Sequence, residues 1–203
     1  MALAYQTALT IESVIKDIDS KKYLLPSIQR EFVWSTGQIE KLFDSLMRDY
    51  PINAFLFWKV PREKVSEFKF YEFLRDYHQK DNKHNPKANT NGTEDIIAIL
   101  DGQQRMTSLY IALKGTYAYK MSYKRWDNPA AYPKRKLYLN LLAASDDADM
   151  FYDFLFLTEE EAKNIKNDND EYEGSFWFPV GKILDFREES DAVSYTHLTL
   201  PTT

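Results

Sequence analysis

The sequence predicts a mixed α/β domain, and three observations support this fold class. Short apolar runs, which are typical of strands, alternate along the chain with amphipathic stretches, which are typical of helices. The composition is that of a globular protein, with 44% hydrophobic and 15% aromatic residues among 203. The sequence contains no repeat of fixed period, which argues against a repeat fold. A chain of this length is long enough for one core of ordinary size.

The composition also excludes several classes of protein. The absence of cysteine excludes a disulfide framework, a thiolate metal site and a cysteine nucleophile. A net charge of −5 argues against a uniformly basic nucleic-acid coat but leaves room for a local basic stripe. The first twenty residues lack the basic start and apolar core of a secretory signal, and no apolar run is long enough to cross a bilayer. We therefore expect a soluble cytoplasmic protein with no membrane partner.

The N-terminal half predicts two helices and short strands. A helix is expected over residues 11–18 with Thr10 as its N-cap, followed by a strand over residues 23–25 that Pro26 ends or confines to a sheet edge. Ser35 and Gln38 have the spacing of a capping box and begin an amphipathic helix that ends before Pro51.

Between this helix and the middle of the chain, two apolar segments and one polar segment follow. The nearly continuous apolar run NAFLFWKV, residues 53–60, predicts a buried strand. The alternation in FKFYEFL, residues 68–74, predicts a half-exposed strand. Residues 75–93 are polar and predict a long loop that is a lid, a binding loop or disordered.

The C-terminal half begins with a predicted central strand over residues 96–100. The helix after it has Met106, Leu109 and Leu113 on one face and ends at Gly115, which is expected as its C-cap. KLYLNLL and FYDFLF predict two further strands, and TEEEAKNIK predicts a helix with Thr158 as its cap.

The motif AILDGQQRMTSL, residues 98–109, lies where the central strand meets the helix after it. The first N–H groups of a helix have no partner within the helix, and together with the helix dipole they form a site for anions. Gly102 lets a ligand approach the backbone closely, and Arg105 has a planar group that suits phosphate. These residues predict a pocket for a phosphate-bearing ligand.

Asp101 leaves two interpretations of this motif open, because its carboxylate would repel a bare anion. In the first, Asp101 is the helix N-cap, Gln104 reaches back at capping-box spacing, and no ligand binds. In the second, Asp101 faces a Mg²⁺ ion that bridges it to the phosphates of a nucleotide. The motif alone favours the cap.

A second Gln-Arg pair, Gln29 and Arg30 in SIQREFVW, lies just after a predicted strand and before a capped helix. This pair repeats the arrangement of the first motif, although a solvated cation is the alternative for Arg30. Two cationic helix entrances of this kind are suited to converge on one polyphosphate.

Three blocks in this order, Pro-x-x-Gln-Arg-x-x-x-Trp, LFDSLMRDYPI and ILDGQQRMTSL, resemble the N-terminal domain of GmrSD-type modification-dependent restriction endonucleases. The resemblance runs from about Leu9 to Asp185 and implies the α/β fold of the ParB/sulfiredoxin-like superfamily. It also implies binding and hydrolysis of a nucleoside triphosphate through the DGQQR block. In this family the activity gates cleavage of modified phage DNA, commonly by a separate C-terminal HNH-class nuclease domain, which this sequence does not show.

The motif and the resemblance together define the expected site. The expected catalytic residues are Asp101, Gln103, Gln104 and Arg105. The expected nucleotide- and phosphate-binding residues are Gln29, Arg30, Gly102, Arg105 and Thr107. The expected cofactors are Mg²⁺, held through Asp101, and a nucleoside triphosphate. The expected partners are DNA, including modified phage DNA, and a nuclease domain or subunit that is missing here.

The segment GTYAYKMSYKRWDNPAAYPKRKLYL, residues 115–139, interleaves basic and aromatic residues and contains one acid, Asp127. This pattern is typical of surfaces that follow a nucleic-acid backbone while aromatic rings stack on bases. A solvated loop whose tyrosines partly pack is an equally good interpretation. The candidate DNA contacts are Lys120, Lys124, Arg125, Lys134, Arg135 and Lys136, with Tyr123, Trp126 or Tyr132 as the stacking rings.

The end of the chain has a different character. Residues 193–203, VSYTHLTLPTT, carry no charge and resemble the in-frame translation of a transposon-end sequencing adapter, so we expect a non-native tail. The remaining residues 1–192 then form one family-like domain that is truncated at its C-terminal end. For that reason we expect Trp177 and Phe178 in FWFPVGKILDF to be exposed.

The leading hypothesis is a nucleoside-triphosphate-binding and hydrolysing sensor domain of an anti-phage restriction protein. Two alternatives remain open. In the first alternative, the domain is a nuclease that acts on DNA itself with the same acid and arginines. In the second, it is a non-catalytic module that binds a nucleotide or DNA to switch partner contacts.

Overall fold

The structure is a computed structural model that describes residues 9–28, 31–90, 95–164 and 176–187, and these fall into two compact units. Unit 1 comprises Met1–Arg30, Phe55–Phe73 and Asn85–Gln103, and unit 2 comprises Glu31–Ala54, Leu74–His84 and Gln104–Thr203. Each unit has its own sheet and helices, so the predicted mixed α/β fold class is confirmed. Among the described residues, no helix is both long and apolar enough to cross a membrane.

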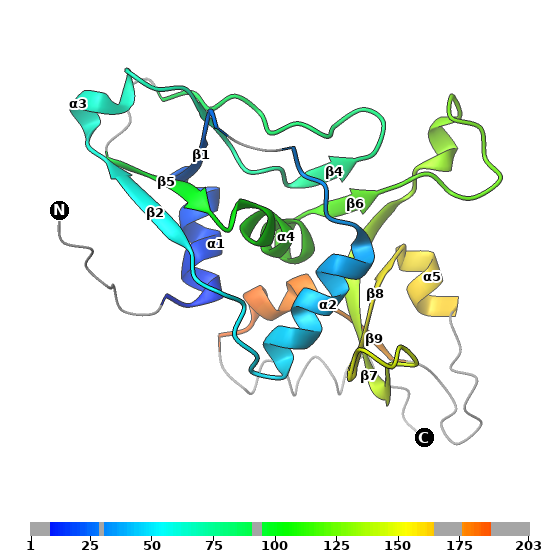
Figure 1. Cartoon of the computed structure of the whole chain (residues 1–203). Coiled ribbons are helices and arrows are strands. Elements are labelled where there is room, and N and C mark those ends of the chain that lie inside the picture. Colours follow the sequence, from blue (N-terminus) through cyan, green and yellow to red (C-terminus); the bar gives the residue numbers. More distant parts are fainter. Residues whose placement is uncertain (1–8, 29–30, 91–94, 165–175, 188–203) are drawn as a thin grey trace. The chain divides into compact units, whose positions relative to one another are not determined.

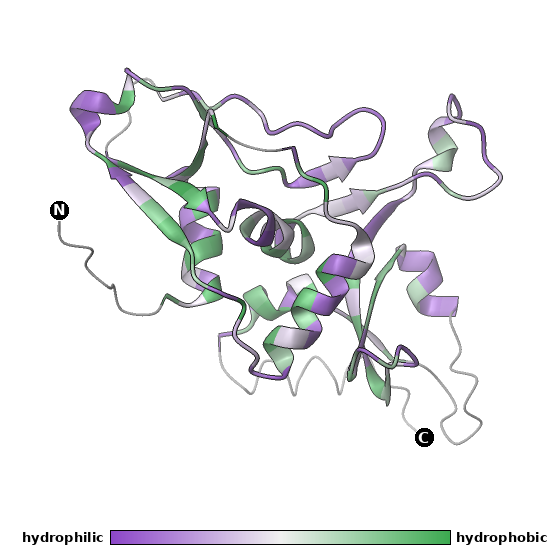
Figure 2. Cartoon of the chain, viewed as in Figure 1, coloured by the Kyte–Doolittle hydropathy of each residue, from purple (hydrophilic) through white to green (hydrophobic). Residues whose placement is uncertain are grey.

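Unit 1 is built on a four-stranded sheet with the order β2-β5-β1-β3. Its strands are β1 (Tyr23–Pro26), β2 (Leu56–Val60), β3 (Phe70–Tyr71) and β5 (Ile96–Asp101). β5 occupies a central position, as predicted, and runs parallel to β1, whereas β2 and β3 are antiparallel to their neighbours. Figure 2 shows that β5 is largely hydrophobic, which suits a strand with a neighbour on each side.

Two helices complete unit 1. α1 (Ile11–Asp19) begins at the predicted cap, since the Thr10 hydroxyl accepts the Ser13 N–H, and its face of Val14, Ile15 and Ile18 is buried. α3 (Arg62–Val65) is a single turn after Pro61. Figure 1 shows α1 beside β1, and the two elements are in contact.

The expected buried strand in residues 53–60 is wrong in its burial and in its length. β2 begins only at Leu56, and Leu56 and Phe57 are exposed, while Val60 is completely buried. The reason is position: β2 is an edge strand of the sheet, and an apolar run does not by itself show whether both faces of a strand are covered.

Unit 2 contains a mixed sheet with the order β4-β6-β7-β8, and β9 also pairs with β7. Its strands are β4 (Asp76–His78), β6 (Thr116–Ala118), β7 (Lys134–Ala144), β8 (Tyr152–Leu157) and β9 (Trp177–Pro179). The helical elements are α2 (Thr36–Met47), α4 (Gln103–Lys114, whose first residue belongs to unit 1), η1 (Pro129–Ala131), α5 (Glu159–Asn164) and η2 (Val180–Asp185). Strands β7 and β8 follow the predicted KLYLNLL and FYDFLF runs.

Helix α2 is fixed to β8 by two acids on its buried face. The predicted capping box is present, with Ser35 and Gln38 each bonded to the backbone of the other. Asp44 accepts the N–H groups of Phe151 and Tyr152 at 2.8 Å. Glu40 accepts the Phe156 N–H at 3.0 Å, and both acids are buried. These bonds satisfy backbone donors of the strand that no neighbouring strand reaches.

Three further expectations are corrected in unit 2. Residues 75–93 are not only loop, because β4 pairs with β6 in parallel there. Gly115 does not have the left-handed conformation of a glycine C-cap. Close packing explains the glycine at this position instead, because a Cβ would collide with the backbone carbonyl of Arg75. Trp177 is buried rather than exposed, because β9 pairs with β7, and Phe178 is partly buried.

Helix α4 differs from its prediction in one respect. Its length agrees with the expectation, but Met106 to Leu113 are all buried, so the helix has no solvent-facing side over two turns. The apolar stripe alone predicted one buried face. The small and polar residues Thr107, Ser108 and Ala112 occupy the other faces, where they allow close packing around the helix.

Candidate functional site

The DGQQR motif occupies the junction between β5 and α4. β5 ends at Asp101, Gly102 follows with a φ of 85°, and α4 begins at Gln103. Gly102 is buried and is the residue that allows this left-handed turn from strand to helix. Asp101 is exposed at the end of its strand.

Asp101 is the last residue of β5. Gly102, and not Asp101, directly precedes the first helical residue. The Gln104 side chain, which a capping box would need, is bonded elsewhere. The carboxylate therefore stands at the carboxyl end of a strand and outside the helix.

In unit 1 the parallel pairing of β1 and β5 places the carboxyl ends of two strands at one side of the sheet. Tyr23 pairs with Ile97 and Leu24 with Ala98, so the two strands end at the same side of the sheet. β5 leads directly into Asp101 and Gly102, while β1 ends at Pro26, three residues before Gln29. Gln29 and Arg30 lie outside the described residues, and their predicted role stays a prediction.

In unit 2 the side chain of Gln104 holds the chain that follows Arg30. Its Nε2 donates to the carbonyl of Glu31 at 2.8 Å, and its Oε1 accepts the N–H of Val33 at 3.1 Å. The amide thus pairs with the backbone of residues 31–33 in the way a neighbouring strand would. The DGQQR motif therefore fixes the segment that comes directly after Gln29 and Arg30 in the sequence.

Arg105 holds another segment of unit 2. Its guanidinium donates to the carbonyl of Ile52 and, at 2.9 Å, to the carbonyl of Ala54. Between these residues Asn53 has a φ of 74°, a left-handed conformation that asparagine tolerates better than most residues. A planar cation that bridges two carbonyls stabilises such a turn. In this structure Arg105 therefore shapes the loop after α2.

The remaining predicted residues of the motif are placed as follows. Gln103 donates from Nε2 to the carbonyl of Ile99 at 2.9 Å, back along β5. Thr107 lies one turn into α4 and is 3% exposed, so its hydroxyl is part of the interior. No group of three or more His, Asp or Glu side chains suited to a metal ion occurs within the described ranges. Within the DGQQR motif itself, Asp101 is the one acidic residue.

The candidate DNA contacts divide into three groups. Lys124 and Arg125 are exposed in the loop between β6 and β7, and Lys134 and Lys136 are exposed on β7. Arg135 is 4% exposed and stacks over the Tyr119 ring, with Glu161 at 3.5 Å. The alternation of a strand explains this split, since it turns Arg135 to the face opposite its neighbours. The burial of Arg135 therefore contradicts its expected role as a DNA contact.

Lys120 is half-buried, and its side chain is bonded within its own loop. Its ammonium donates to the carbonyls of Met121 and Lys124 and lies 5.7 Å from the centre of the Trp126 ring. Tyr132 is buried and donates its hydroxyl to the Trp126 carbonyl, so it is not available to stack on a base. These two residues hold the loop together.

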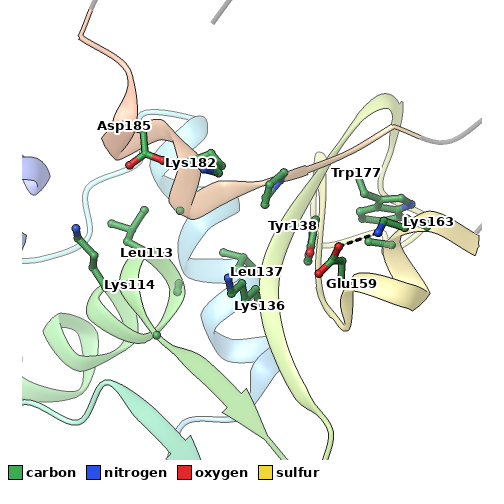
Figure 3. Close-up of a pocket in the computed structure, with 15 residues that line it drawn as sticks. Leu113, Lys114, Lys136, Leu137, Tyr138, Glu159, Lys163, Trp177, Lys182 and Asp185 are labelled. Carbon is green, nitrogen blue, oxygen red and sulfur yellow. Dashed lines mark hydrogen bonds and ion pairs between the residues drawn. The ribbon is translucent and has the colours of Figure 1, made fainter. Parts of the chain in front are cut away.

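A pocket of about 530 Å³ lies at the other end of α4. Four lysines from four elements line it: Lys114, Lys136, Lys163 and Lys182. Lys163 pairs with Glu159 at 2.7 Å and Lys182 with Asp185 at 3.1 Å, as Figure 3 shows for the first pair. The motif lies at the N-terminal end of this 12-residue helix, about 18 Å along its axis, so the pocket is not the site of the motif.

Sequence reasoning missed the backbone partners of Gln104 and Arg105. Their acceptors are carbonyl groups of Glu31, Ile52 and Ala54, which any residue type would supply. The only signal was indirect: Asn53 follows a proline-containing stretch and is a residue type that favours turns. Such pairings become visible only with the fold.

Comparison with known proteins supports the resemblance seen in the motifs. The family model described as the GmrSD restriction endonuclease, N-terminal domain, matches residues 11–195. An uncharacterized protein of Methanocaldococcus jannaschii is 33% identical over 113 residues. The aligned stretch covers 56% of this chain and 18% of that protein, so the chain spans less than a fifth of its relative.

Proposed function

Because the chain belongs to the GmrSD restriction endonuclease N-terminal domain family, we propose that it binds and hydrolyses a nucleoside triphosphate and thereby regulates DNA restriction. In this proposal it is the sensor domain of a cytoplasmic, anti-phage restriction protein that acts on modified DNA. The cut itself is made by a nuclease domain or subunit outside this chain. A ParB-like ancestry of the domain belongs to the same proposal.

The observation that carries the proposal is the sheet edge of unit 1. Parallel strands β1 and β5 end side by side, and each leads into one of the two Gln-Arg motifs. Ligands of open α/β sheets bind outside the carboxyl ends of such strands. The acid Asp101 and the buried glycine Gly102 stand at this edge.

The residues at this edge fit a magnesium nucleotide. Gly102, with its φ of 85°, makes the left-handed turn at this edge, and without a side chain it places no Cβ in the way of a phosphate at the start of α4. Mg²⁺ is ordinarily held by one or two carboxylates together with substrate phosphates and water, and Asp101 would be that carboxylate. When bound, the ion neutralises phosphate charge that would otherwise be repelled by Asp101.

The hydrogen bonds of the structure divide the roles among the motif residues. Gln104 and Arg105 position the chain, since their side chains hold residues 31–33 and 52–54. We assign orientation of the attacking water to Gln103 and stabilisation of developing charge to Arg30, both of which belong to unit 1.

The same hydrogen bonds favour one second candidate, a nucleotide-binding switch without catalysis. Three of the four polar side chains of the motif, those of Gln103, Gln104 and Arg105, donate to backbone carbonyls. A module of this kind would bind the nucleotide, alter the segments held by Gln104 and Arg105, and release it unchanged.

Release of inorganic phosphate from each of the four nucleoside triphosphates, with and without Mg²⁺, tests the proposal. We expect Mg²⁺-dependent turnover that falls at least about tenfold in Asp101→Asn. The control is Asp49→Asn, which is expected to retain wild-type turnover because asparagine suits the left-handed backbone of that residue. Binding without turnover supports the switch, and equal turnover in Asp101→Asn contradicts the role of Asp101.

A further inference from the structure

The loop between β6 and β7, residues 119–133, extends away from the sheet of unit 2, at the right of Figure 1. It carries the exposed half of the basic and aromatic segment. Tyr123 is fully exposed and Trp126 is 56% exposed. Two large rings in contact with water at one loop tip are unusual, because an exposed aromatic ring forgoes the stabilisation that burial gives.

The loop is held in one conformation by its own hydrogen bonds. The Met121 N–H donates to the Ala131 carbonyl at 2.7 Å and closes the base of the loop. Lys120 donates to two carbonyls within it, and Asn128 caps the turn η1. The Lys120 N–H also donates to Gln79 at 2.7 Å, which ties the loop to the turn after β4. The two rings are therefore presented by a rigid support.

Tyr123 has a φ of 62°. This left-handed conformation is uncommon for a bulky residue and is disfavoured relative to glycine. A glycine at this position would fold more easily, yet the chain places its most exposed aromatic ring there. Strain of this kind concentrates at sites that bind.

The charges around the rings are mainly positive. Lys124, Arg125 and Lys134 are exposed in or beside the loop, and Lys80 is exposed in the turn that the loop contacts. The opposing acids are Asp127, which pairs with Arg125 at 3.3 Å, and Asp81, which pairs with His78 at 3.4 Å. This patch is mainly positive, although the chain as a whole has a net charge of −5.

From this arrangement we infer that loop 119–133 contacts DNA, with Tyr123 and Trp126 stacked on unpaired bases and Lys124 and Arg125 on the phosphates between them. The inference rests on the DNA-acting part of the proposed function and names the surface that performs it. Rigid aromatic rings interleaved with cations are the arrangement that single-stranded nucleic acid requires. An anionic membrane is the less suitable partner, because the exposed loop tip carries no aliphatic side chain to enter acyl chains.

Fluorescence anisotropy of the full chain with a labelled single strand of about 20 nucleotides, and with the matching duplex, tests this inference. We expect Tyr123→Gly to weaken single-strand binding about tenfold, equivalent to about 1.4 kcal/mol, with no loss of thermal stability. Tyr123→Phe retains the ring and is expected to bind as the wild type does. The combined change Lys124→Ala and Arg125→Ala lowers the slope of log K against log salt by about 1.4.

The matched control is Phe151→Ala, which removes another exposed ring of unit 2 and is expected to leave binding unchanged. Unchanged affinity in Tyr123→Gly overturns the inference. So does binding of this loop to anionic phosphatidylserine vesicles in place of DNA. A wild-type chain that hydrolyses nucleotide but binds no DNA also overturns it, and that result leaves the proposed nucleotide activity standing.

Discussion

Gly102 is the residue on which the strand-to-helix junction depends. Its left-handed conformation costs a residue with a Cβ roughly 1–2 kcal/mol, and its burial leaves little room for relaxation. In the proposed site, the lack of a side chain also keeps a Cβ out of the way of a phosphate between Asp101 and Gln103. The fold and the proposed phosphate site therefore both favour glycine at position 102.

Gly102→Ala is expected to lower the free energy of unfolding by about 1–2 kcal/mol. Gly37→Ala is the control, since Gly37 lies in the first turn of α2 and an added Cβ there meets only a Glu40 oxygen at 3.8 Å. The control is expected to be neutral or to stabilise by up to about 1 kcal/mol. Urea denaturation of both variants measures the difference, and equal effects would show that the φ of Gly102 imposes no constraint.

At the scale of elements, Gln104 connects the first turn of α4 to the segment that leads into α2. Both atoms of its amide are used, one as donor and one as acceptor. Neither a carboxylate nor a hydrocarbon replaces such a pair, because the Glu31 carbonyl needs a donor and the Val33 N–H needs an acceptor.

Gln104→Ala is expected to cost about 1–3 kcal/mol of stability, because it removes two hydrogen bonds, each of which contributes about 0.5–1.5 kcal/mol. Gln104→Glu is expected to be no better, since its carboxylate faces the Glu31 carbonyl. The exposed Glu160→Ala is expected to change stability by less than about 0.5 kcal/mol and is the control. Chemical denaturation of the three variants is the measurement. A Gln104→Glu protein as stable as the wild type would mean that the Glu31 bond contributes nothing.

The elements that the sequence predicts well are those with local signals. Thr10, Ser35 and Thr158 cap their helices as expected, because a cap is formed within four residues. The exposure of β2 and the existence of β4 depend instead on which strand lies next to them, and no local pattern contains that. Gly115 is a similar case, since its constraint is the distant Arg75 backbone.

The candidate site shows the same division. The position of Asp101 and Gly102 between a central strand and a helix follows from the apolar pattern and is confirmed. The partners of Gln104 and Arg105 are backbone groups more than 50 residues away, so the residue types suggested a ligand where the fold supplies carbonyls. Periodicity likewise separates Arg135 from Lys134 and Lys136 only once β7 is known to be a strand.

At the scale of the whole molecule, the buried Glu40 of α2 makes stability depend on pH. Burial raises the pKa of Glu40 from 4.5 to about 7, although the Phe156 N–H opposes this shift and nearby Asp153 adds to it. Burial also raises the pKa of Asp153, against the hydrogen bond from Asn140. Between pH 4.5 and 7 the folded chain binds more protons at Glu40 than the unfolded chain does, so stability falls as pH rises through this range.

Glu40→Gln is expected to remove most of this dependence, because glutamine still accepts the Phe156 N–H but carries no charge. At pH 8 the variant is expected to be more stable than the wild type by about 1–3 kcal/mol, and near pH 4.5 the two are expected to be equal. Thermal unfolding at a series of pH values measures this. If the variant is less stable than the wild type at pH 8, the ionised carboxylate is stabilising and the assignment fails.

Calorimetric titration with each Mg²⁺–triphosphate tests the proposed nucleotide site at the sheet edge of unit 1 most directly. Arg30→Ala is a better probe than Arg105→Ala, because Arg105 also holds the 52–54 turn. We expect the folded chain to bind a triphosphate at about micromolar concentration, and we expect this binding to be lost in Arg30→Ala and kept in Lys16→Ala on α1. A folded chain that binds none of the four triphosphates, or an Arg30→Ala protein that binds as tightly as the wild type, would contradict it.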